Sequence, residues 1–127
     1  MNFEKVMFAF FIVLALTLNF GFFIGEIDDP NHHDVLELAA ALIVSLNATI
    51  MKFGDRSQMG AVLLATSLVA DLQLLIAAGY WVWAVNVSVD GTSTVVIARI
   101  VSLSGGALLA NLVSVTLLIA ETISIRR

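Results

Sequence analysis

The sequence predicts an all-α integral membrane protein, with four transmembrane helices in an up-down antiparallel bundle and both the N- and C-termini in the cytoplasm. The 127 residues are 60% hydrophobic and 13% charged, whereas ordinary soluble domains carry about 25% charge. Four apolar runs follow one another with short polar connections, and each approaches or exceeds the ~20 residues that cross a bilayer. Residues 1–127 therefore form a single four-span transmembrane domain.

The first span is predicted over residues 3–25. Its apolar run is nearer twenty residues than ten, and no small-x-small cleavage site follows before Glu26, so we expect an uncleaved helix rather than a signal peptide. Asn19 is the one strongly polar side chain in its interior. An amide in hydrocarbon needs a partner, so Asn19 should face another helix.

An acidic segment, GEIDDPNHHD, connects the first two spans. Asp29 before Pro30 is typical of a helix start, and Asn31 with Asp34 is an alternative cap. Imidazole and carboxylate groups suit a divalent cation or a pH response, but adjacent histidines rarely ligate one ion, so we expect a solvated loop with capping acids and no metal site. In an oligomer the same side chains would form an acidic outer mouth that concentrates cations. This predicted mouth consists of Asp28, Asp29, His32, His33 and Asp34.

The second span is predicted over residues 33–53. Glu37, Ala41, Ser45 and Ala48 share one helical face, with Asn47 near its edge. The polar turn that follows offers Gly54 as a helix C-cap and Ser57 as the next N-cap. Because this connection is so short, the second and third spans must be antiparallel neighbours.

The third span, over residues 58–85, carries the strongest candidate for a functional group. Asp71 lies thirteen residues after Gln58, near the bilayer midplane, where carboxylates are expensive and usually functional. We interpret Asp71 as an ion-binding or proton-carrying group near Asn47, with Ser67 lining or supporting the same path. A hydrogen bond that only fixes helix packing is the alternative interpretation. The aromatic residues Tyr80, Trp81 and Trp83 are placed at the far membrane boundary.

The fourth span, over residues 94–122, follows a polar loop in which Asp90-Gly91 indicates a turn. Arg99 lies at a depth similar to that of Glu37, which predicts an ion pair or side chains that reach the interface separately. A contact between Arg99 and Asp71 is the other alternative. Small residues recur every four positions along this span and predict close helix packing, within the bundle or between copies. This seam consists of Ala98, Ser102, Gly106, Ala110 and Ser114.

The basic residues set the orientation. The first and third loops contain no lysine or arginine, so the positive-inside rule places both termini and the middle loop in the cytoplasm. The residues on that side are Lys5, Lys52, Arg56, Arg126 and Arg127.

The rest of the composition mainly excludes functions. Cysteine is absent, which excludes disulfides and thiol chemistry, and the lack of a basic cluster argues against nucleic-acid binding. The segment 52–74, KFGDRSQMGAVLLATSLVADLQL, together with LTLNFGFF at 16–23, resembles a family of small uncharacterised bacterial inner-membrane proteins. The resemblance implies four helices in a bacterial inner membrane. It implies no activity and transfers no functional residue.

We therefore expect a multi-pass protein whose surroundings are the lipid bilayer, and two functional hypotheses stand. The first is a homo-oligomeric channel or transporter for small cations built around Asp71. The second is a non-transporting accessory or scaffold subunit that binds a larger membrane-protein complex through the fourth span. An intramembrane enzyme ranks last because no acid–base set at matching depth stands out, and we expect neither catalysis nor a cofactor.

Overall fold

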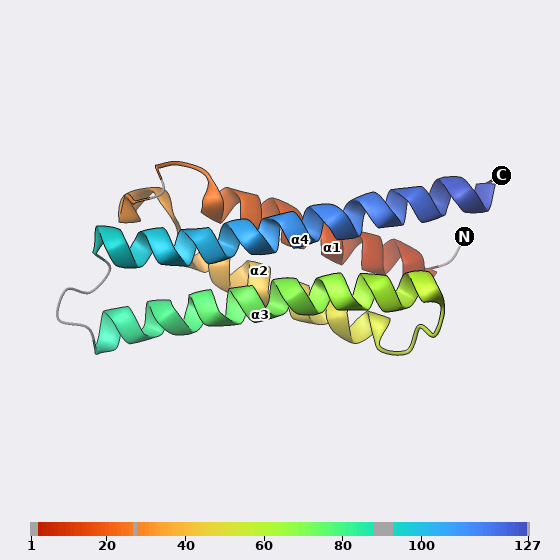
Figure 1. Cartoon of the computed structure of the whole chain (residues 1–127), viewed down its shortest axis with the longest axis horizontal. Helices are drawn as coiled ribbons and strands as arrows, with labels where there is room; N and C mark the ends of the chain where they lie inside the picture. Colours follow the sequence, from red (N-terminus) through yellow and green to blue (C-terminus); the bar gives the residue numbers. More distant parts are fainter. Residues whose placement is uncertain (1–2, 27, 88–92, 127) are drawn as a thin grey trace.

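The structure is a computed structural model that describes residues 3–26, 28–87 and 93–126. These residues form four α-helices and one short 3-10 turn, and the described ranges contain no strand. The helices lie side by side, and α1 begins where α4 ends, at one end of the bundle (Figure 1). The predicted all-α fold with four helices is therefore confirmed. The elements are α1 (Phe3–Phe23), η1 (Pro30–His32), α2 (Val35–Lys52), α3 (Gln58–Asn86) and α4 (Thr94–Arg126).

The four helices form a closed ring in which each helix packs mainly against two others. α1 packs against α2, α2 against α3, α3 against α4, and α4 against α1, with the most extensive contact between α3 and α4. Consecutive helices run in opposite directions, as their short connections require. The ring therefore leaves one shared interior for side chains from all four helices.

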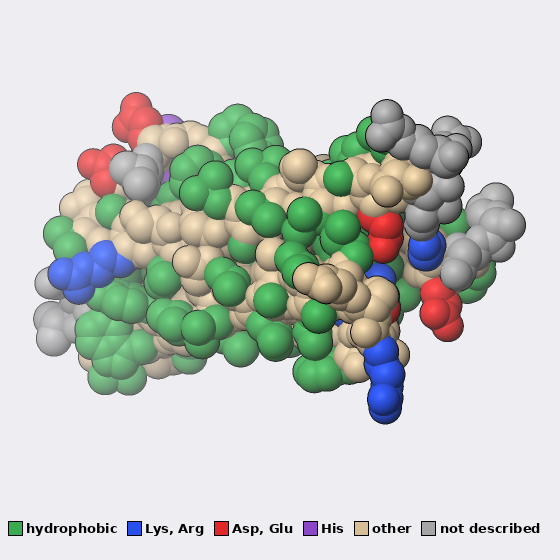
Figure 2. All heavy atoms as spheres, turned by 45° about the vertical axis from the view of Figure 1, so that its right-hand side comes forward, with side chains coloured by type: hydrophobic (Ala, Val, Ile, Leu, Met, Phe, Trp, Pro, Cys, Tyr) green, Lys and Arg blue, Asp and Glu red, His purple; other side chains and the backbone are tan. Residues whose placement is uncertain are grey.

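All four helices are long and apolar enough to cross a membrane, and mean hydropathy in their most apolar windows ranges from 1.6 to 2.3. Hydrophobic side chains cover the middle of the visible surface, while the charged side chains gather toward the two ends (Figure 2). Large apolar side chains such as Phe10, Ile43 and Leu109 are exposed, as lipid-facing residues are. These features are those of a multi-pass membrane protein.

The two ends of the bundle differ in charge. The basic end carries Lys5, Lys52 and Arg56, together with the connection between α2 and α3. The acidic end carries the connection between α1 and α2, including Asp28 and Asp34. That the basic end faces the cytoplasm stays a prediction of the positive-inside rule.

The capping contacts confirm the predicted start of α3 and correct the predicted start of α2. Ser57 caps α3, because its hydroxyl accepts a hydrogen bond of 3.0 Å from the Gly60 N–H. Asp29 caps the turn that begins at Pro30, and Asp34 caps α2 by accepting 2.9 Å from the Leu36 N–H. The second span therefore begins at neither predicted cap: Asp29 caps only the three-residue turn Pro30–His32, Asn31 lies within that turn, and α2 begins at Val35 after Asp34.

Gly54 does not act as the predicted C-cap. α2 ends at Lys52 and its C-cap residue is Phe53, in right-handed helical geometry, whereas Gly25 (φ 109°) is the one glycine with positive φ in the described ranges. The chain turns instead through Asp55, whose N–H donates to the Lys52 carbonyl and whose side chain accepts from Ser57. The predicted turn at Asp90-Gly91 lies outside the described residues.

Two apolar clusters fill the interior, one toward each end. The larger cluster, toward the acidic end, contains Phe22, Leu38, Leu74 and Ile97 among others, and the smaller one, toward the basic end, contains four buried side chains. Between the two clusters the buried side chains are largely polar. The four side chains of the smaller cluster are Phe8, Ile12, Ala48 and Leu63. The polar layer between the two clusters is where a functional site would lie.

Candidate functional site at the bundle midplane

Asp71 occupies the middle of α3 and is buried in the interior, with 4% of its surface exposed. Two hydroxyl groups from α2 reach its carboxyl group. Ser45 donates from Oγ to Asp71 Oδ1 at 2.6 Å, and the Thr49 hydroxyl contacts Oδ2. Ser45 and Thr49 are four residues apart, so one turn of α2 presents both hydroxyls on the same face. The carboxyl group is thus held by the helix that precedes α3.

The hydrogens available to this cluster can be counted. Thr49 Oγ1 lies 3.0 Å from the Ser45 carbonyl oxygen in addition to its contact with Asp71, which makes three oxygen–oxygen contacts in all. Three contacts need three hydrogens, and the two hydroxyls supply two. A protonated Asp71 supplies the third and satisfies every contact, whereas an ionised Asp71 leaves one contact without a hydrogen. The neutral acid also avoids a charge in the apolar interior.

Further polar side chains lie close to this depth without a partner. Ser67, one turn before Asp71 on α3, is fully buried, and its hydroxyl has no hydrogen-bond partner among the described residues. The Asn111 side chain on α4 is also fully buried, and neither its nitrogen nor its oxygen is bonded within the described ranges. Buried polar atoms are nearly always satisfied, so such groups call for water, an ion or a relay function.

The register between α3 and α4 gives the depth of Asn111. Thr66 hydrogen-bonds to Ser114 at 2.5 Å, and Arg99 donates to the Tyr80 hydroxyl at 3.0 Å. These two contacts fix one antiparallel register over most of the shared length, and that register places Asn111 opposite Val69. Asn111 therefore lies at a depth between Ser67 and Asp71, in the same polar layer.

Asn47 does not belong to this layer. It lies on the exposed face of α2, so the predicted approach of Asn47 to Asp71 is wrong. The correct partner is Thr49, two residues further on, which shares its face with Ser45. The sequence contained a signal for this choice. A four-residue step from Ser45 leads to Thr49 on the same helix face, whereas Asn47 is rotated from Ser45 by about 200° around the helix axis.

Glu37 and Arg99 do not form the predicted ion pair: among the described residues no ion pair joins either side chain to a partner. Glu37 packs toward α1, where a Cβ added at Gly21 would lie 2.0 Å from its carboxylate oxygen. Arg99 donates a hydrogen bond to Tyr80 of α3, on the side of the helix ring away from α1. Among the described residues, neither Arg99 nor Glu37 forms a hydrogen bond or an ion pair with Asp71. The smallness of Gly21 is what makes room for Glu37 against α1.

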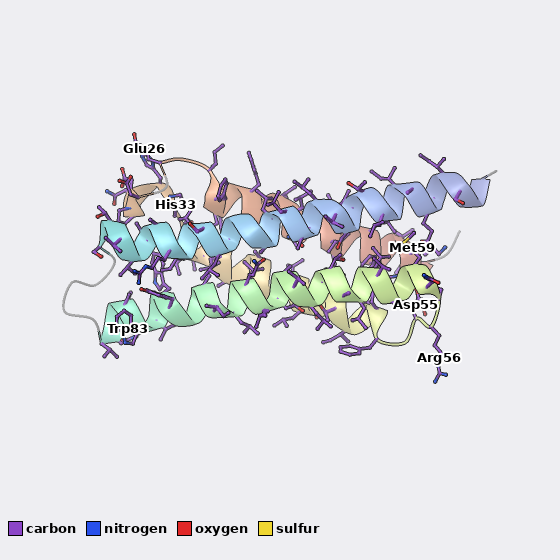
Figure 3. All side chains as sticks on the ribbon, viewed as in Figure 1. Glu26, His33, Asp55, Arg56, Met59 and Trp83 are labelled. Carbon is purple, nitrogen blue, oxygen red and sulfur yellow. The ribbon has the colours of Figure 1, made fainter. Side chains whose placement is uncertain are left out.

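The acidic end shows one large departure from the expected solvated loop. His33 is buried at 3% exposure, and its ring nitrogens lie 2.5 Å from the Phe22 carbonyl oxygen and 2.7 Å from that of Glu26. His33 thereby binds the last turn of α1 to the start of α2 (Figure 3). Both contacts are to acceptors, so both ring nitrogens donate only when the imidazole carries two hydrogens.

The other members of the predicted mouth are engaged locally or exposed. Asp29 accepts from the Asn31 N–H at 2.9 Å and lies 3.3 Å from His32 Nε2, and Asp34 caps α2. His32 Nδ1 accepts 2.9 Å from the Glu26 N–H. Asp28 is exposed. Among the described residues, no three His, Asp or Glu side chains are grouped so that they could hold a metal ion.

The small-residue seam of α4 is used partly inside the bundle. Ser114 is buried against Thr66, and a Cβ added at Gly106 would lie 2.4 Å from the amide nitrogen of Gln73. Ala98 and Ser102, by contrast, line a groove at the acidic end. Ala110 is half-buried.

As predicted, Asn19 faces another helix, where it bonds to Ser104 of α4 at 2.5 Å.

The sequence was then compared with known proteins. A family model described as a family of unknown function, DUF6394, matches residues 32–122, well over half of the chain. The chain belongs to this family. No curated protein and no solved structure matches it.

The DUF6394 match covers the whole of α2 and α3 and most of α4. It therefore includes Ser45, Thr49, Ser67, Asp71 and Asn111, every residue of the midplane layer described above. α1, with Asn19, lies outside it. The resemblance to an uncharacterised family is thus confirmed, while the bacterial inner membrane stays an expectation.

Proposed function

We propose that this multi-pass membrane protein is a channel or transporter for small cations, that the cation is the proton, and that Asp71 is the group that holds it in transit. The observation that carries the proposal is the set of three contacts around Asp71, which only the protonated acid satisfies in full. Two cavities, of about 710 and 580 Å³, lie toward the ends of the bundle, and Asp71 lines neither of them. A proton needs only a chain of hydrogen bonds, whereas a metal cation needs space for its ligands.

Release of the proton has a defined local consequence. When Asp71 loses its hydrogen, the Thr49 hydroxyl turns from the Ser45 carbonyl toward the charged oxygen, so one rotation keeps both carboxyl oxygens of Asp71 hydrogen-bonded in either state. Ser67 and Asn111 offer unpaired polar atoms at the neighbouring depth, where a water molecule or a hydroxyl can accept the proton.

Polar side chains continue from the midplane toward the basic end. Lys52 follows Thr49 by one turn of α2, about 4.5 Å along the axis, and it is buried at 8% exposure. Its amine lies 3.4 Å from Asp55 Oδ2 and lines a cavity of about 580 Å³ at the basic end. This cavity is the supply route that the proposal requires on that side.

Toward the acidic end the route runs through Gln73 and the pair formed by Asn19 and Ser104. Gln73 Oε1 is buried with no hydrogen-bond partner among the described residues, and Gly106 leaves room for this side chain. The route lies within one bundle. Homo-oligomerisation through the outward part of the α4 seam remains compatible with it but is not required for conduction.

The test is proton flux into liposomes that contain the purified protein and a pH-sensitive dye. Wild type is expected to dissipate an imposed pH gradient, and Asp71→Asn is expected to fall to the rate of empty liposomes because an amide cannot give up the proton. Asn47→Leu changes a polar side chain of similar depth on the exposed face of α2 and should keep the wild-type rate.

A second readout follows the proton itself. The infrared band of a protonated carboxylic acid should be present in wild type and absent from Asp71→Asn. A folded wild type without flux would overturn the transport proposal. Undiminished flux from Asp71→Asn would remove Asp71 from the route.

One observation favours the second candidate, a non-transporting accessory subunit. Both oxygens of Asp71 are engaged by α2, which is what a purely structural link between α2 and α3 also requires. An accessory subunit predicts no flux and a membrane-protein partner that co-purifies in stable stoichiometry. Neither candidate is an enzyme.

A further inference from the structure

A lateral groove opens between α3 and α4 near the acidic end, with a volume of about 710 Å³. Its wall is mainly apolar, built from side chains such as Ile76, Ala98 and Leu103. Ala98 is one of the small residues of the α4 seam, so the groove exists where that seam is not filled by α3. In a bilayer, acyl chains reach such a surface directly.

The groove also contains an arginine within a membrane span. Arg99 lies five residues into α4, about 7.5 Å along the axis from Thr94, and a side chain of this length reaches toward the membrane interface. One of its terminal nitrogens donates to the Tyr80 hydroxyl at 3.0 Å. A guanidinium has five N–H donors, and no carboxylate lies within ion-pair distance of Arg99 among the described residues. The remaining donors are thus available for an acceptor in the groove.

Asp28 lines the same groove from the connection between α1 and α2. It is exposed, and it forms no ion pair with a described residue. It belongs to the connection between α1 and α2, outside the helices, whereas Arg99 lies inside the α4 span. The groove therefore presents apolar side chains together with a cation and an anion.

We propose that this groove binds one phospholipid with an ammonium headgroup, such as phosphatidylethanolamine. An acyl chain lies along Ile76, Ala98 and Leu103, the phosphate accepts hydrogen bonds from Arg99, and the ammonium group meets Asp28. The headgroup supplies an anionic phosphate for the cation of the groove and an ammonium group for its anion. Guanidinium binds phosphate through paired, charge-assisted hydrogen bonds. The site is independent of the proton route through Asp71.

The experiment is native mass spectrometry of the full chain released from vesicles of phosphatidylethanolamine, phosphatidylglycerol or phosphatidylcholine, with inorganic phosphate as a fourth ligand. Wild type is expected to retain one phosphatidylethanolamine in preference to the other two lipids. Arg99→Gln should weaken retention of every phospholipid by about tenfold or more. Asp28→Asn should abolish only the preference for phosphatidylethanolamine over phosphatidylglycerol.

Matched controls separate the site from general charge. Arg56 extends away from the bundle at the basic end, and Glu26 points outward from the same loop as Asp28 (Figure 3). Arg56→Gln and Glu26→Gln should therefore retain lipid like wild type. Ser102→Leu fills the groove and should displace the lipid without any change of charge, whereas Ala120→Leu adds the same bulk on an exposed part of α4.

Several outcomes would overturn the proposal. Equal retention by wild type and Arg99→Gln would show that Arg99 does not bind the phosphate. Binding of inorganic phosphate alone, without lipid, would replace the lipid with a free anion. A dimer mass that Ser102→Leu abolishes would show that a second copy of the chain fills the groove.

Discussion

At the connection between α2 and α3, Asp55 Oδ1 accepts hydrogen bonds from both the hydroxyl and the N–H of Ser57, at 2.7 and 2.9 Å. The hydrogen bond from the Ser57 hydroxyl, followed by that from the Ser57 N–H, lowers the pKa of Asp55; burial opposes this effect, and Lys52 adds to it through a hydrogen bond and its charge. A carboxyl group with a lowered pKa in the folded state stabilises the fold wherever it is ionised.

The stability of the fold should therefore fall as Asp55 becomes protonated. The contribution of Asp55 is complete above the pKa of the unfolded chain, about 3.9, and is lost as the pH falls through the lower pKa of the folded state. Asp55→Asn should remove this part of the acid sensitivity, measured as the unfolding temperature in detergent at stepwise lower pH. Glu26→Gln, in the other loop, should leave the profile unchanged. Identical profiles for wild type and Asp55→Asn would contradict the assignment.

The positions of some buried residues could be predicted from the sequence, and the position of His33 could not. The midplane depth of Asp71, the inward face of Ser45 and the partner for Asn19 all follow from spacing and from the cost of polar groups in hydrocarbon. The burial of His33 could not be predicted, because its two acceptors are backbone carbonyls of the chain before η1. Backbone groups at a helix end are the same in every sequence, so no side-chain pattern marks them.

At the scale of helices, α4 approaches its neighbours through two consecutive glycines. A Cβ at Gly105 would lie 2.8 Å from the Phe23 ring of α1, and one at Gly106 would meet Gln73 of α3. Gly79, in contrast, has open space around the position of a Cβ. The three glycines thus provide a matched test of close packing.

Gly106→Leu should destabilise the bundle by about 1–3 kcal/mol, because the added side chain exceeds what a shift of Gln73 can accommodate. Gly79→Leu makes the identical change where nothing opposes it and should alter the stability by less than about 0.5 kcal/mol. Unfolding in mixed detergent micelles measures both. Equal losses for the two variants would show that the close approach of α4 to α3 contributes nothing.

The spans themselves were predictable to within a few residues, since apolar length is set by the bilayer. The first and last residues of each span were less predictable. α2 begins at Val35 rather than His33, because Asp34 caps it, and α4 continues to Arg126, beyond the predicted end at residue 122. Small-residue spacing predicted close packing along α4, but it could not divide the seam between Ser114, which faces α3, and Ser102, which lines the groove.

At the scale of the whole molecule, the order of helices around the ring can be tested with cysteine pairs, since the chain contains no cysteine of its own. Thr66→Cys with Ser114→Cys should cross-link α3 to α4, because the native hydroxyls are 2.5 Å apart. Asn19→Cys with Ser104→Cys should cross-link α1 to α4, because the Asn19 amide oxygen lies 2.5 Å from the Ser104 hydroxyl.

A control pair on two helices that lie across the ring from each other completes this test. Asn47→Cys with Ser114→Cys combines an exposed position on α2 with a buried one on α4, and it should remain reduced under the same mild oxidation. Intramolecular cross-links are read from mobility in non-reducing gels after protease cleavage in the α2–α3 or α3–α4 connection. A cross-link in the control pair alone would require a different helix order.

The unequal lengths of the helices have a consequence for the surrounding bilayer. α1 and α2, which pack together, contain 21 and 18 residues, whereas α3 and α4 contain 29 and 33. At 1.5 Å per residue the first pair spans roughly 27–32 Å and the second roughly 44–50 Å. Beside the short pair, the bilayer must become thinner or keep its usual hydrocarbon thickness of ~30 Å. The long pair must tilt or thicken the bilayer on its side of the protein. The protein therefore imposes a gradient of thickness across its own lipid annulus and should partition toward regions where bilayers of different thickness meet.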